Sequence, residues 1–275
     1  MRLSKGEVMR ERHFEGLSTV NIELTDRCNK NCWFCGRRKR EREHPEIIAQ
    51  YGDIDFDLLE KIAHELPPNI VVQLHNNGES TLYPRFGEAA KLFSRQITNI
   101  VTNGSLLLKR MDHIVGNLDT ITVSVIENDP DGEAQLDTIR EFIRLKGEKR
   151  PQVILRFNGN VDAKKYEDLN LIKARRILHD PMGSFNYKKP PTIPEIGICW
   201  DFLHHMAINH RGEVSICVRY DPEQVGVIGD AQTERLVDVW NSPQREEWLE
   251  YHKTSRRDLV PLCKKCDFWG VPTSP

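Results

Sequence analysis

Short runs in which apolar and polar residues alternate recur along the first two thirds of the chain. Val20, Ile22 and Leu24 alternate with polar residues, a pattern typical of a strand with one buried face. Similar apolar runs predict four more strands and a weak sixth, at residues 70–75, 97–102, 120–125, 153–157 and 177–179.

Helical spacing of apolar residues separates these strands. Two segments each place their apolar residues on one helix face: Phe56, Leu59, Ile62, Ala63 and Leu66, and then Leu136, Ile139 and Ile143. Weaker patterns predict helices at 84–94, 106–115 and 163–174. Alternating strands and helices give a parallel sheet with right-handed crossovers. Six such units predict an α/β fold, a partial (β/α)6 TIM-type barrel, because a complete barrel needs eight.

The pattern changes at a proline-rich break, residues 188–191, which predicts a domain boundary. Beyond it, two alternating segments, 206–208 and 214–216, flank a turn that contains Gly212 and predict a β-hairpin. Helices are expected at 233–241 and from Ser242–Pro243, with Ser242 as N-cap, and Trp240 and Trp248 should pack them onto the hairpin. We therefore expect an N-terminal extension (1–17), a barrel (18–187) and a small α+β domain (188–275).

Charge and composition narrow the function classes. The 275 residues include 39 Lys plus Arg and 41 Asp plus Glu, a net charge of -2 that argues against a dedicated nucleic-acid binder. No apolar run approaches the roughly 18 residues that span a bilayer, and the charged N-terminus lacks a secretory apolar segment. We expect a cytoplasmic protein without a membrane partner. In a reducing compartment, clustered cysteines are better explained as metal ligands or catalytic thiols than as disulfides.

The first cysteine set, Cys28, Cys32 and Cys35, has the spacing C-x3-C-x2-C and follows the first predicted strand. Barrel enzymes place their chemistry at this end of the strands. Three thiolates in one loop can hold three irons of a cubane cluster and leave the fourth iron open. The alternatives are a zinc knuckle, which needs a distant fourth ligand, or buried thiols.

The second set comprises the other four cysteines, Cys199, Cys217, Cys263 and Cys266. Two of them form a C-x2-C pair, and the other two precede and end the predicted hairpin. Four converging thiolates make a closed site, and their spacing alone leaves a fully ligated Fe–S cluster and a structural zinc open.

These residues together resemble the radical S-adenosylmethionine (SAM) superfamily. The C-x3-C-x-Phe-C signature includes Phe34, residues 77–79 (Asn-Gly-Glu) are similar to the family's Gly-Gly-Glu motif, and residues 102–104 and 123–125 also fit. The sequence departs from the family at Asn77, which replaces a glycine; Asn is among the residues that best tolerate unusual backbone angles. Arg156 and Asn158 lie near the family's remaining SAM motifs, without a clear match.

The last third resembles the auxiliary-cluster domains of the superfamily, called SPASM and, in shortened form, twitch. The second cysteine set, the glycine of the hairpin and the segments 227–230 and 239–243 carry this resemblance. Too few cysteines are present for a second auxiliary cluster, which implies the twitch form. The segment resembles that of 2-deoxy-scyllo-inosamine dehydrogenases, functional analogues with this two-cluster arrangement.

The resemblance implies two [4Fe–4S] clusters and SAM as cofactors. Cys28, Cys32 and Cys35 would hold the SAM-binding cluster, and the second set the auxiliary one. Phe34 would pack near the adenine of SAM, and Ser124 would bond its ribose. Asn77 and Gly78 would allow close approach of the backbone, and Glu79 would accept a hydrogen bond from the SAM ammonium group. Ser124 could instead bond the backbone, and Phe34 could be a plain core aromatic.

The implied reaction is hydrogen abstraction from substrate by a 5′-deoxyadenosyl radical. If all seven cysteines are ligands, no thiol remains to return a hydrogen atom, which favours oxidation with the auxiliary cluster as electron acceptor. The sequence identifies no proton acceptor. The alternatives are a redox-neutral dehydratase or rearrangement enzyme, a peptide-modifying enzyme, and a non-catalytic Fe–S or zinc protein.

Substrate and partners follow from the same resemblance. Only 27 residues precede Cys28, too few for a peptide-recognition domain, so a small hydroxylated or amino substrate, such as a sugar or cyclitol, is favoured over a peptide. The basic run at residues 37–40 could dock a flavodoxin- or ferredoxin-like electron donor or a phosphate-bearing substrate, but the alternating charges beside it suit a solvated loop. His204 and His205 could be ligands or acid–base groups, although packing or surface roles are commoner.

Overall fold

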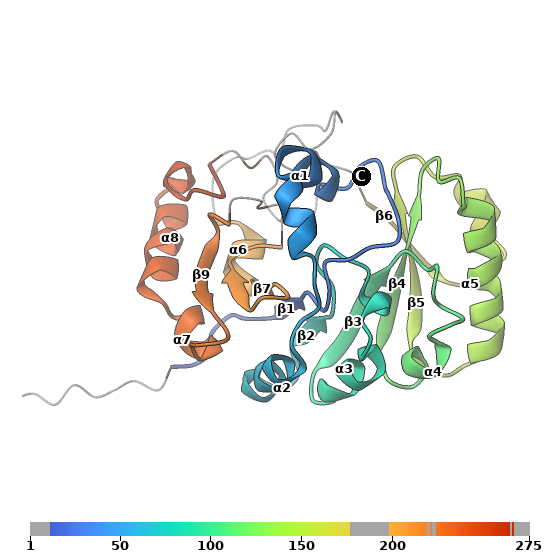
Figure 1. Ribbon diagram of the computed structural model, residues 1–275, viewed down its shortest axis with the longest axis horizontal. Helices are drawn as coiled ribbons and strands as arrows, with labels where there is room; N and C mark the ends of the chain where they lie inside the picture. Colours follow the sequence, from blue (N-terminus) through green and yellow to red (C-terminus); the bar gives the residue numbers. More distant parts are fainter. Residues whose placement is uncertain (1–11, 177–197, 219–220, 222–223, 265, 267–275) are drawn as a thin grey trace, which may run out of the picture.

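A single twisted sheet organises the molecule. The computed structural model describes residues 12–176, 198–218, 221, 224–264 and 266. Within them, the strand order is β6-β5-β4-β3-β2-β1-β7-β8-β9 (Figure 1). The first six strands are parallel: β1 (Thr19–Ile22), β2 (Val71–Gln73), β3 (Ile97–Thr102), β4 (Thr120–Ile126), β5 (Gln152–Asn158) and β6 (Ile172–Arg176). They form the predicted partial barrel, and five of them confirm the predicted strands to within a few residues.

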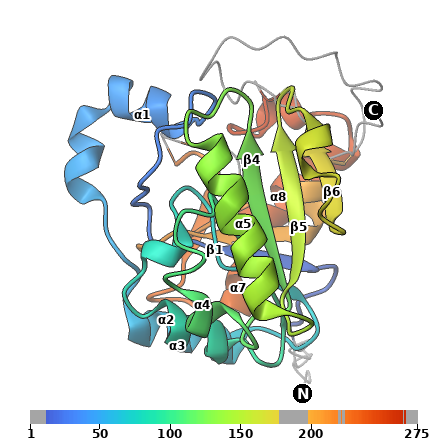
Figure 2. The same cartoon turned by 90° about the vertical axis from the view of Figure 1, so that its right-hand side faces the viewer.

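Helices cover the apolar face of this sheet. After β1 come α1 (Arg37–Glu43), η1 (Pro45–Gln50) and α2 (Phe56–Glu65); later connections hold η2 (Ser80–Leu82), α3 (Phe86–Leu92), α4 (Met111–Ile114) and α5 (Gly132–Lys146). The predicted helix faces are buried, with Leu59 and Ile62 of α2 and Ile139 of α5 fully so. Figures 1 and 2 both show α5 lying against β4 and β5. The apolar core therefore lies between the helices and one side of the sheet.

The opposite side of the sheet is polar. The strand register places Asn21, Gln73, Asn99 and Thr120 side by side on this face. Asn21 donates to Gln73 Oε1 at 3.5 Å, and Asn99 donates to Thr120 Oγ1 at 2.7 Å. Polar groups in the interior of a barrel leave hydrogen-bonding capacity for ligands, so this face is where small molecules are expected to bind.

The sixth unit differs from its prediction. Residues 163–174 were expected to form a helix, but they hold only the short η3 (Ala163–Tyr166) and the start of β6. The strand expected at 177–179 lies outside the described residues, and the observed β6 precedes it. All five residues of β6 are exposed, so this edge strand has no buried face and no apolar alternation to reveal it.

The C-terminal part continues the same sheet. It contains α6 (Trp200–His204), β7 (His205–Ile208), β8 (Glu213–Ser215), β9 (Val227–Asp230), α7 (Leu236–Trp240), α8 (Pro243–Lys253) and η5 (Arg257–Leu259). The predicted hairpin is confirmed as the antiparallel pair β7–β8, and Gly212 in its turn has a φ of 91°. Strand β7 also pairs in parallel with β1, from Thr19↔His205 to Ile22↔Ile208. The carboxyl ends of β1 and β7 therefore lie at one edge of the sheet.

Both predicted C-terminal helices are present. Ser242 caps α8 as expected, because its Oγ accepts from the Arg245 backbone N–H at 3.3 Å. Trp240 and Trp248 are buried, and the indole N–H of Trp240 donates to the Glu15 carbonyl at 3.0 Å. The described end of the N-terminal extension thus packs on α7. The boundary expected at 188–191 lies outside the described residues, and no helix of the described chain is long and apolar enough to cross a membrane.

Candidate cofactor sites and the interdomain pocket

The first three cysteines lie in the loop that leaves the carboxyl end of β1. Cys28, Cys32 and Cys35 are all half-buried free thiols. The backbone N–H of Lys30 points to Cys28 Sγ at 3.5 Å, and the Cys35 N–H donates to the Cys32 carbonyl at 3.2 Å. Burial and the neighbouring Cys35 and Cys28 raise the pKa of Cys32 to about 12. A bound cation would offset this cost of ionising Cys32, because a metal deprotonates its thiol ligands.

The loop after β2 is fitted against the cysteine loop. A Cβ on Gly78 would stand 2.0 Å from the Thr25 carbonyl oxygen and 2.8 Å from that of Arg27, so only glycine permits this approach. The next residue, Glu79, donates its N–H to the Arg27 carbonyl at 2.8 Å. The sequence motif 77–79 and the cysteine motif are therefore in direct backbone contact.

Asn77, which replaces the first glycine of the family motif, was expected to tolerate an unusual backbone angle. It does not have a positive φ. Its backbone N–H and its Nδ2 instead both donate to Glu23 Oε2, at 3.0 and 2.9 Å. The side chain thus ties the motif to the end of β1, so the expectation of an unusual backbone angle at this position is wrong.

The Glu79 side chain is buried, with 2% of its residue surface exposed, and its carboxylate accepts several hydrogen bonds. Oε1 accepts from Thr102 Oγ1 at 2.8 Å and from Thr81 Oγ1 at 2.6 Å, and Oε2 accepts from the Asn103 N–H at 2.7 Å. This carboxylate organises the ends of β2 and β3. Its predicted contact with a SAM ammonium group stays a prediction, for which Oε2 retains an acceptor site.

The other predicted SAM contacts lie on the same edge of the sheet. Ser124 is half-buried on β4, and its hydroxyl is not hydrogen-bonded to the described residues. Phe34 packs edge-on against Trp33, with ring centroids 5.6 Å apart. Arg156 is half-buried beside Ser124 in the strand register, whereas the Asn158 amide bonds the Val125 and Arg156 carbonyls. Ser124 is therefore available to a ligand, and Asn158 has a structural role.

The second cysteine set is brought together by the C-terminal domain. Cys199 is the N-cap of α6, Cys217 follows β8, and Cys263 and Cys266 follow η5. All four are half-buried free thiols. Burial raises the pKa of Cys199 to about 11 and that of Cys263 to about 12; the nearby Cys266 raises both and Cys199 also raises that of Cys263. The fold thus brings Cys199 near Cys263 and Cys266, and the membership of Cys217 in the four-cysteine site stays a prediction.

Sulfur spacing separates the two kinds of metal centre. Tetrahedral zinc with bonds of about 2.3 Å would hold its thiolates about 3.8 Å apart. Among the described residues, which include all seven cysteines, no three cysteine sulfur atoms lie within 4.8 Å of one another. No three of these thiolates are thus arranged to hold a tetrahedral zinc without moving closer together.

A buried cluster that the sequence did not reveal joins the two parts of the chain. His210 Nδ1, in the β7–β8 turn, lies 3.1 Å from Glu23 Oε1 and 3.6 Å from Asp26 Oδ2, at the carboxyl end of β1. The side chains of all three residues are at least nine-tenths buried. The only signals in the sequence were a carboxylate next to the strand end and a histidine in the hairpin turn.

Glu23 and His210 of this cluster line a small polar pocket between the barrel and the hairpin. The pocket is also bordered by Cys217, a residue of the second cysteine set. Its remaining lining is mostly charged or amide side chains, Arg40, Asn76, Asn77, Asn209, Arg211, Glu213, Asp221 and Gln224. The pocket therefore connects the surroundings of both cysteine sets.

Two predicted groups have ordinary partners. The basic residues of α1 are paired along the helix, Arg37 and Arg38 with Glu41 at 2.8 and 2.7 Å. His204 Nδ1 bonds the Gly16 carbonyl at 2.7 Å, and His205 lies 3.4 Å from Asp201. These contacts account for the histidines as packing residues. They also show that the α1 charges are paired in half-buried positions, so the expectation of a solvated loop is wrong.

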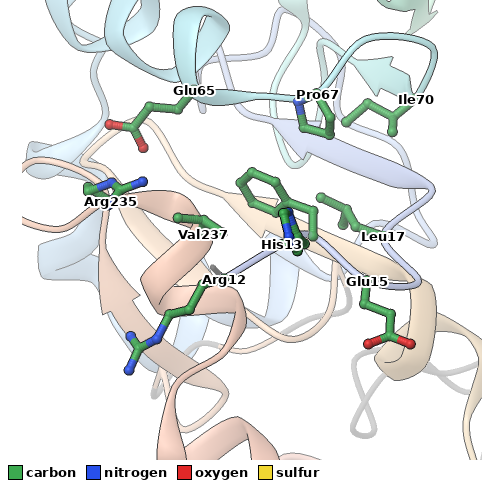
Figure 3. Close-up of a pocket in the computed structure, with 10 residues that line it drawn as sticks. Arg12, His13, Glu15, Leu17, Glu65, Pro67, Ile70, Arg235 and Val237 are labelled. Carbon is green, nitrogen blue, oxygen red and sulfur yellow. The ribbon is translucent and has the colours of Figure 1, made fainter. Parts of the chain in front are cut away.

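A second cavity, of about 700 Å³, lies away from the cysteines (Figure 3). It is lined by the N-terminal segment, the end of α2 and the start of α7, including Phe14, Leu17, Pro67, Ile70 and Val237. Ile70 precedes β2, so this cavity is at the amino ends of the strands. Chemistry in (β/α) barrels occurs at the other end.

Comparison with known proteins agrees with this arrangement. Residues 22–158 match the model of the radical SAM superfamily, and residues 199–267 match that of SPASM, an iron-sulfur cluster-binding domain. The chain belongs to the radical SAM superfamily. No curated protein sequence matches it. The radical SAM domain implies SAM and a [4Fe–4S] cluster, and the SPASM domain implies auxiliary Fe–S binding.

Two solved structures share the fold of this radical SAM protein. BtrN in complex with AdoMet and 2-DOIA is 19% identical, with a TM-score of 0.58, and the alignment covers 94% of this chain and 96% of that one. Streptococcus suis SuiB bound to precursor peptide SuiA is 15% identical, with a TM-score of 0.56, over 92% of this chain and 71% of that one. At these identities the likeness shows the fold alone.

Proposed function

We propose that this radical SAM enzyme is an oxidoreductase with two [4Fe–4S] clusters. Cys28, Cys32 and Cys35 hold the SAM-binding cluster, and the second cysteine set, Cys199, Cys217, Cys263 and Cys266, holds the auxiliary one. The observation that carries the proposal is the polar pocket, which is bordered on one side by Asn77 of the SAM motif and on the other by Cys217. The pocket has a volume of about 60 Å³, so it takes one hydroxyl or amino group of a substrate whose remainder lies outside it.

The groups of the chain have distinct tasks in this proposal. When bound, the clusters supply the electron that cleaves SAM and the acceptor for the electron lost by substrate. Phe34 packs near the adenine, Asn77 and Gly78 offer backbone groups, Glu79 orders the loop and faces the ammonium, and Ser124 bonds the ribose. The polar sheet face orients the substrate, and the hairpin limits the access of water.

Oxidation is favoured by the use of the cysteines. All seven lie in one of the two sets, and Cys217, which borders the pocket, is assigned to the auxiliary cluster, so no thiol is left there as a hydrogen donor. A redox-neutral dehydration or rearrangement would not need the auxiliary centre as an electron acceptor. We therefore place the reaction among dehydrogenations, and counting electrons per product distinguishes it from the redox-neutral alternative.

The substrate is proposed to be a small hydroxylated or amino compound. Carboxylate, amide and guanidinium groups line the pocket, and such groups recognise hydroxyl and ammonium substituents by directed hydrogen bonds. BtrN, of similar length, was solved with 2-DOIA, which supports this class. The likeness to SuiB with its precursor peptide favours a second candidate, a peptide-modifying enzyme.

We further propose that the barrel spans residues 18–187 and the twitch domain residues 188–275. A flavodoxin- or ferredoxin-like protein is proposed as the electron donor.

Anaerobic reconstitution tests the proposed function. We expect about eight irons per chain, 5′-deoxyadenosine when SAM and dithionite are added, and a carbonyl product from a panel of aminocyclitols and sugars that includes 2-deoxy-scyllo-inosamine. A triple Cys28/Cys32/Cys35→Ala variant is the matched control and should form no 5′-deoxyadenosine. About four irons with one zinc, or product formed only from peptides, would contradict the proposal.

A further inference from the structure

The Glu23–His210 pair connects the two domains at the wall of the polar pocket. Glu23 belongs to the end of β1, five residues before the first cysteine, and His210 belongs to the turn between β7 and β8. They meet because β7 extends the sheet in parallel beside β1, which brings both strand ends to one edge. Their contact depends on both domains being in place.

The hydrogen bonds of the pair fix the state of the imidazole. Nδ1 of His210 lies 3.1 Å from Glu23 Oε1. The other carboxylate oxygen, Oε2, accepts hydrogen bonds from the backbone N–H and the Nδ2 of Asn77. A carboxylate at Nδ1 places a proton there and leaves the lone pair of a neutral ring on Nε2. Nε2 has no hydrogen bond to the described residues and is not among their buried polar atoms that lack a partner. The His210 side chain lines the pocket, and Nε2 is the ring nitrogen that Glu23 leaves free to bind a group there.

Charges around the ring set its affinity for a proton. Burial lowers the pKa of His210, but the hydrogen bond to Glu23 and the charges of Asp26 and Glu23 outweigh it, so the pKa is raised; Arg211 in the same turn opposes this. From α1, Arg40 also borders the pocket. Burial raises the pKa of Glu23, yet the bonds from His210 and Asn77 lower it overall. The raised pKa makes the neutral ring a stronger base, and the neutral fraction of His210 grows as the pH rises.

We propose that His210 accepts, at Nε2, the proton that the hydroxyl or amino group of the substrate loses during oxidation, with Glu23 as its positioning residue. This inference rests on the proposed dehydrogenation. The substrate would give a proton to His210, while bound SAM would supply the radical that takes a hydrogen atom and the auxiliary cluster would supply the acceptor for one electron. The C–H bond and the O–H or N–H bond of the substrate break, and a C=O or C=N double bond forms. Atoms, charge and electrons balance without another reactant.

The test compares the reconstituted wild type with His210→Gln, His210→Ala and Glu23→Gln, and with His64→Gln as a control at an exposed histidine of α2. Each is given SAM, dithionite and the aminocyclitol panel, and product and 5′-deoxyadenosine are counted from pH 5.5 to 9. His210→Gln should lower the product formed per 5′-deoxyadenosine about 100-fold and remove the rise of product formation with pH. Added imidazole should partly restore His210→Ala, and the control should match the wild type.

A second readout does not depend on turnover. In protein labelled with 15N-histidine, the His210 signal is the one that His210→Gln removes, and Glu23→Gln should lower its pKa. A wild-type pH profile in His210→Gln, or loss of one bound divalent metal in that variant, would overturn the inference alone. A wild type that makes 5′-deoxyadenosine but no carbonyl product would contradict the proposed oxidation and, with it, this role for His210.

Discussion

Gly78 faces the carbonyl oxygen of Thr25 so closely that a Cβ would stand 2.0 Å from it. A contact this short cannot be accommodated without moving the backbone that leads to Cys28. Gly78→Ala should therefore separate the loop after β2 from the cysteine loop, lowering both the iron bound per chain and the formation of 5′-deoxyadenosine at least tenfold.

The matched control for this variant is Gly132→Ala. A Cβ at this first residue of α5 would lie 4.0 Å from its nearest neighbour, on Asp129. Alanine there should leave iron binding intact and raise stability by about 0.5 kcal/mol. Equal iron contents in the two variants, measured after parallel reconstitution, would contradict the role assigned to Gly78.

Cys263→Ser tests the second cysteine set. Because Cys263 lies with Cys199 and Cys266 in a separate domain, the substitution should remove the auxiliary cluster and lower the iron content from about eight to about four per chain. Iron and zinc are counted by elemental analysis, and the electron paramagnetic resonance spectrum should lose one of two reduced-cluster signals. A variant that loses zinc instead of iron would disprove the auxiliary Fe–S assignment.

Glu79→Gln tests the buried carboxylate. Thr81, Thr102 and Asn103 all donate to it, and an amide in its place would direct its own N–H groups against one or more of these donors. We expect a loss of about 1–3 kcal/mol in the free energy of unfolding. Urea denaturation measures it, with Glu60→Gln on the exposed side of α2 as control. No difference between the two variants would show that the carboxylate does not organise the strand ends.

His75 predicts how stability depends on pH. Burial, together with the charges of Arg156 and Arg176, lowers its pKa to about 3, against 6.5 in the unfolded chain. The unfolded state therefore binds the proton first, and stability falls as the pH drops below 6.5. One such group costs about 1 kcal/mol between pH 6.5 and 5.5. Urea denaturation across this range should show a smaller loss in His75→Gln; an equal slope would contradict the shifted pKa.

Much of the fold was predictable because a strand or helix with one buried face repeats its apolar residues at a regular spacing. Strands β1 to β5 each have one apolar face, and α2 and α5 repeat their buried residues at helical spacing. Strand β6 has no buried face, so its sequence carried no strand signal, and its first residues, 172–174, were wrongly expected to be helical. The parallel pairing of β7 with β1 joins segments nearly 190 residues apart, and local patterns do not encode such a contact.

Part of the candidate site was likewise predictable from the sequence, and part was not. The cysteines and the 77–79 motif were found because their chemistry demands a short spacing along the chain. Glu23 occupies a polar position in an alternating strand, which is ordinarily solvent-facing, and His210 lies in a turn where polar residues are common. Only the folded structure shows that they meet, with both side chains buried.

The parallel seam between β1 and β7 has a consequence for how the two domains can be separated. If the chain after residue 198 were removed, β1 would become a bare strand edge whose unpaired N–H and C=O groups invite pairing with other chains. A truncated barrel should then aggregate rather than persist as a smaller enzyme. A descendant of this protein could lose the second set of thiols, but it would have to keep the hairpin.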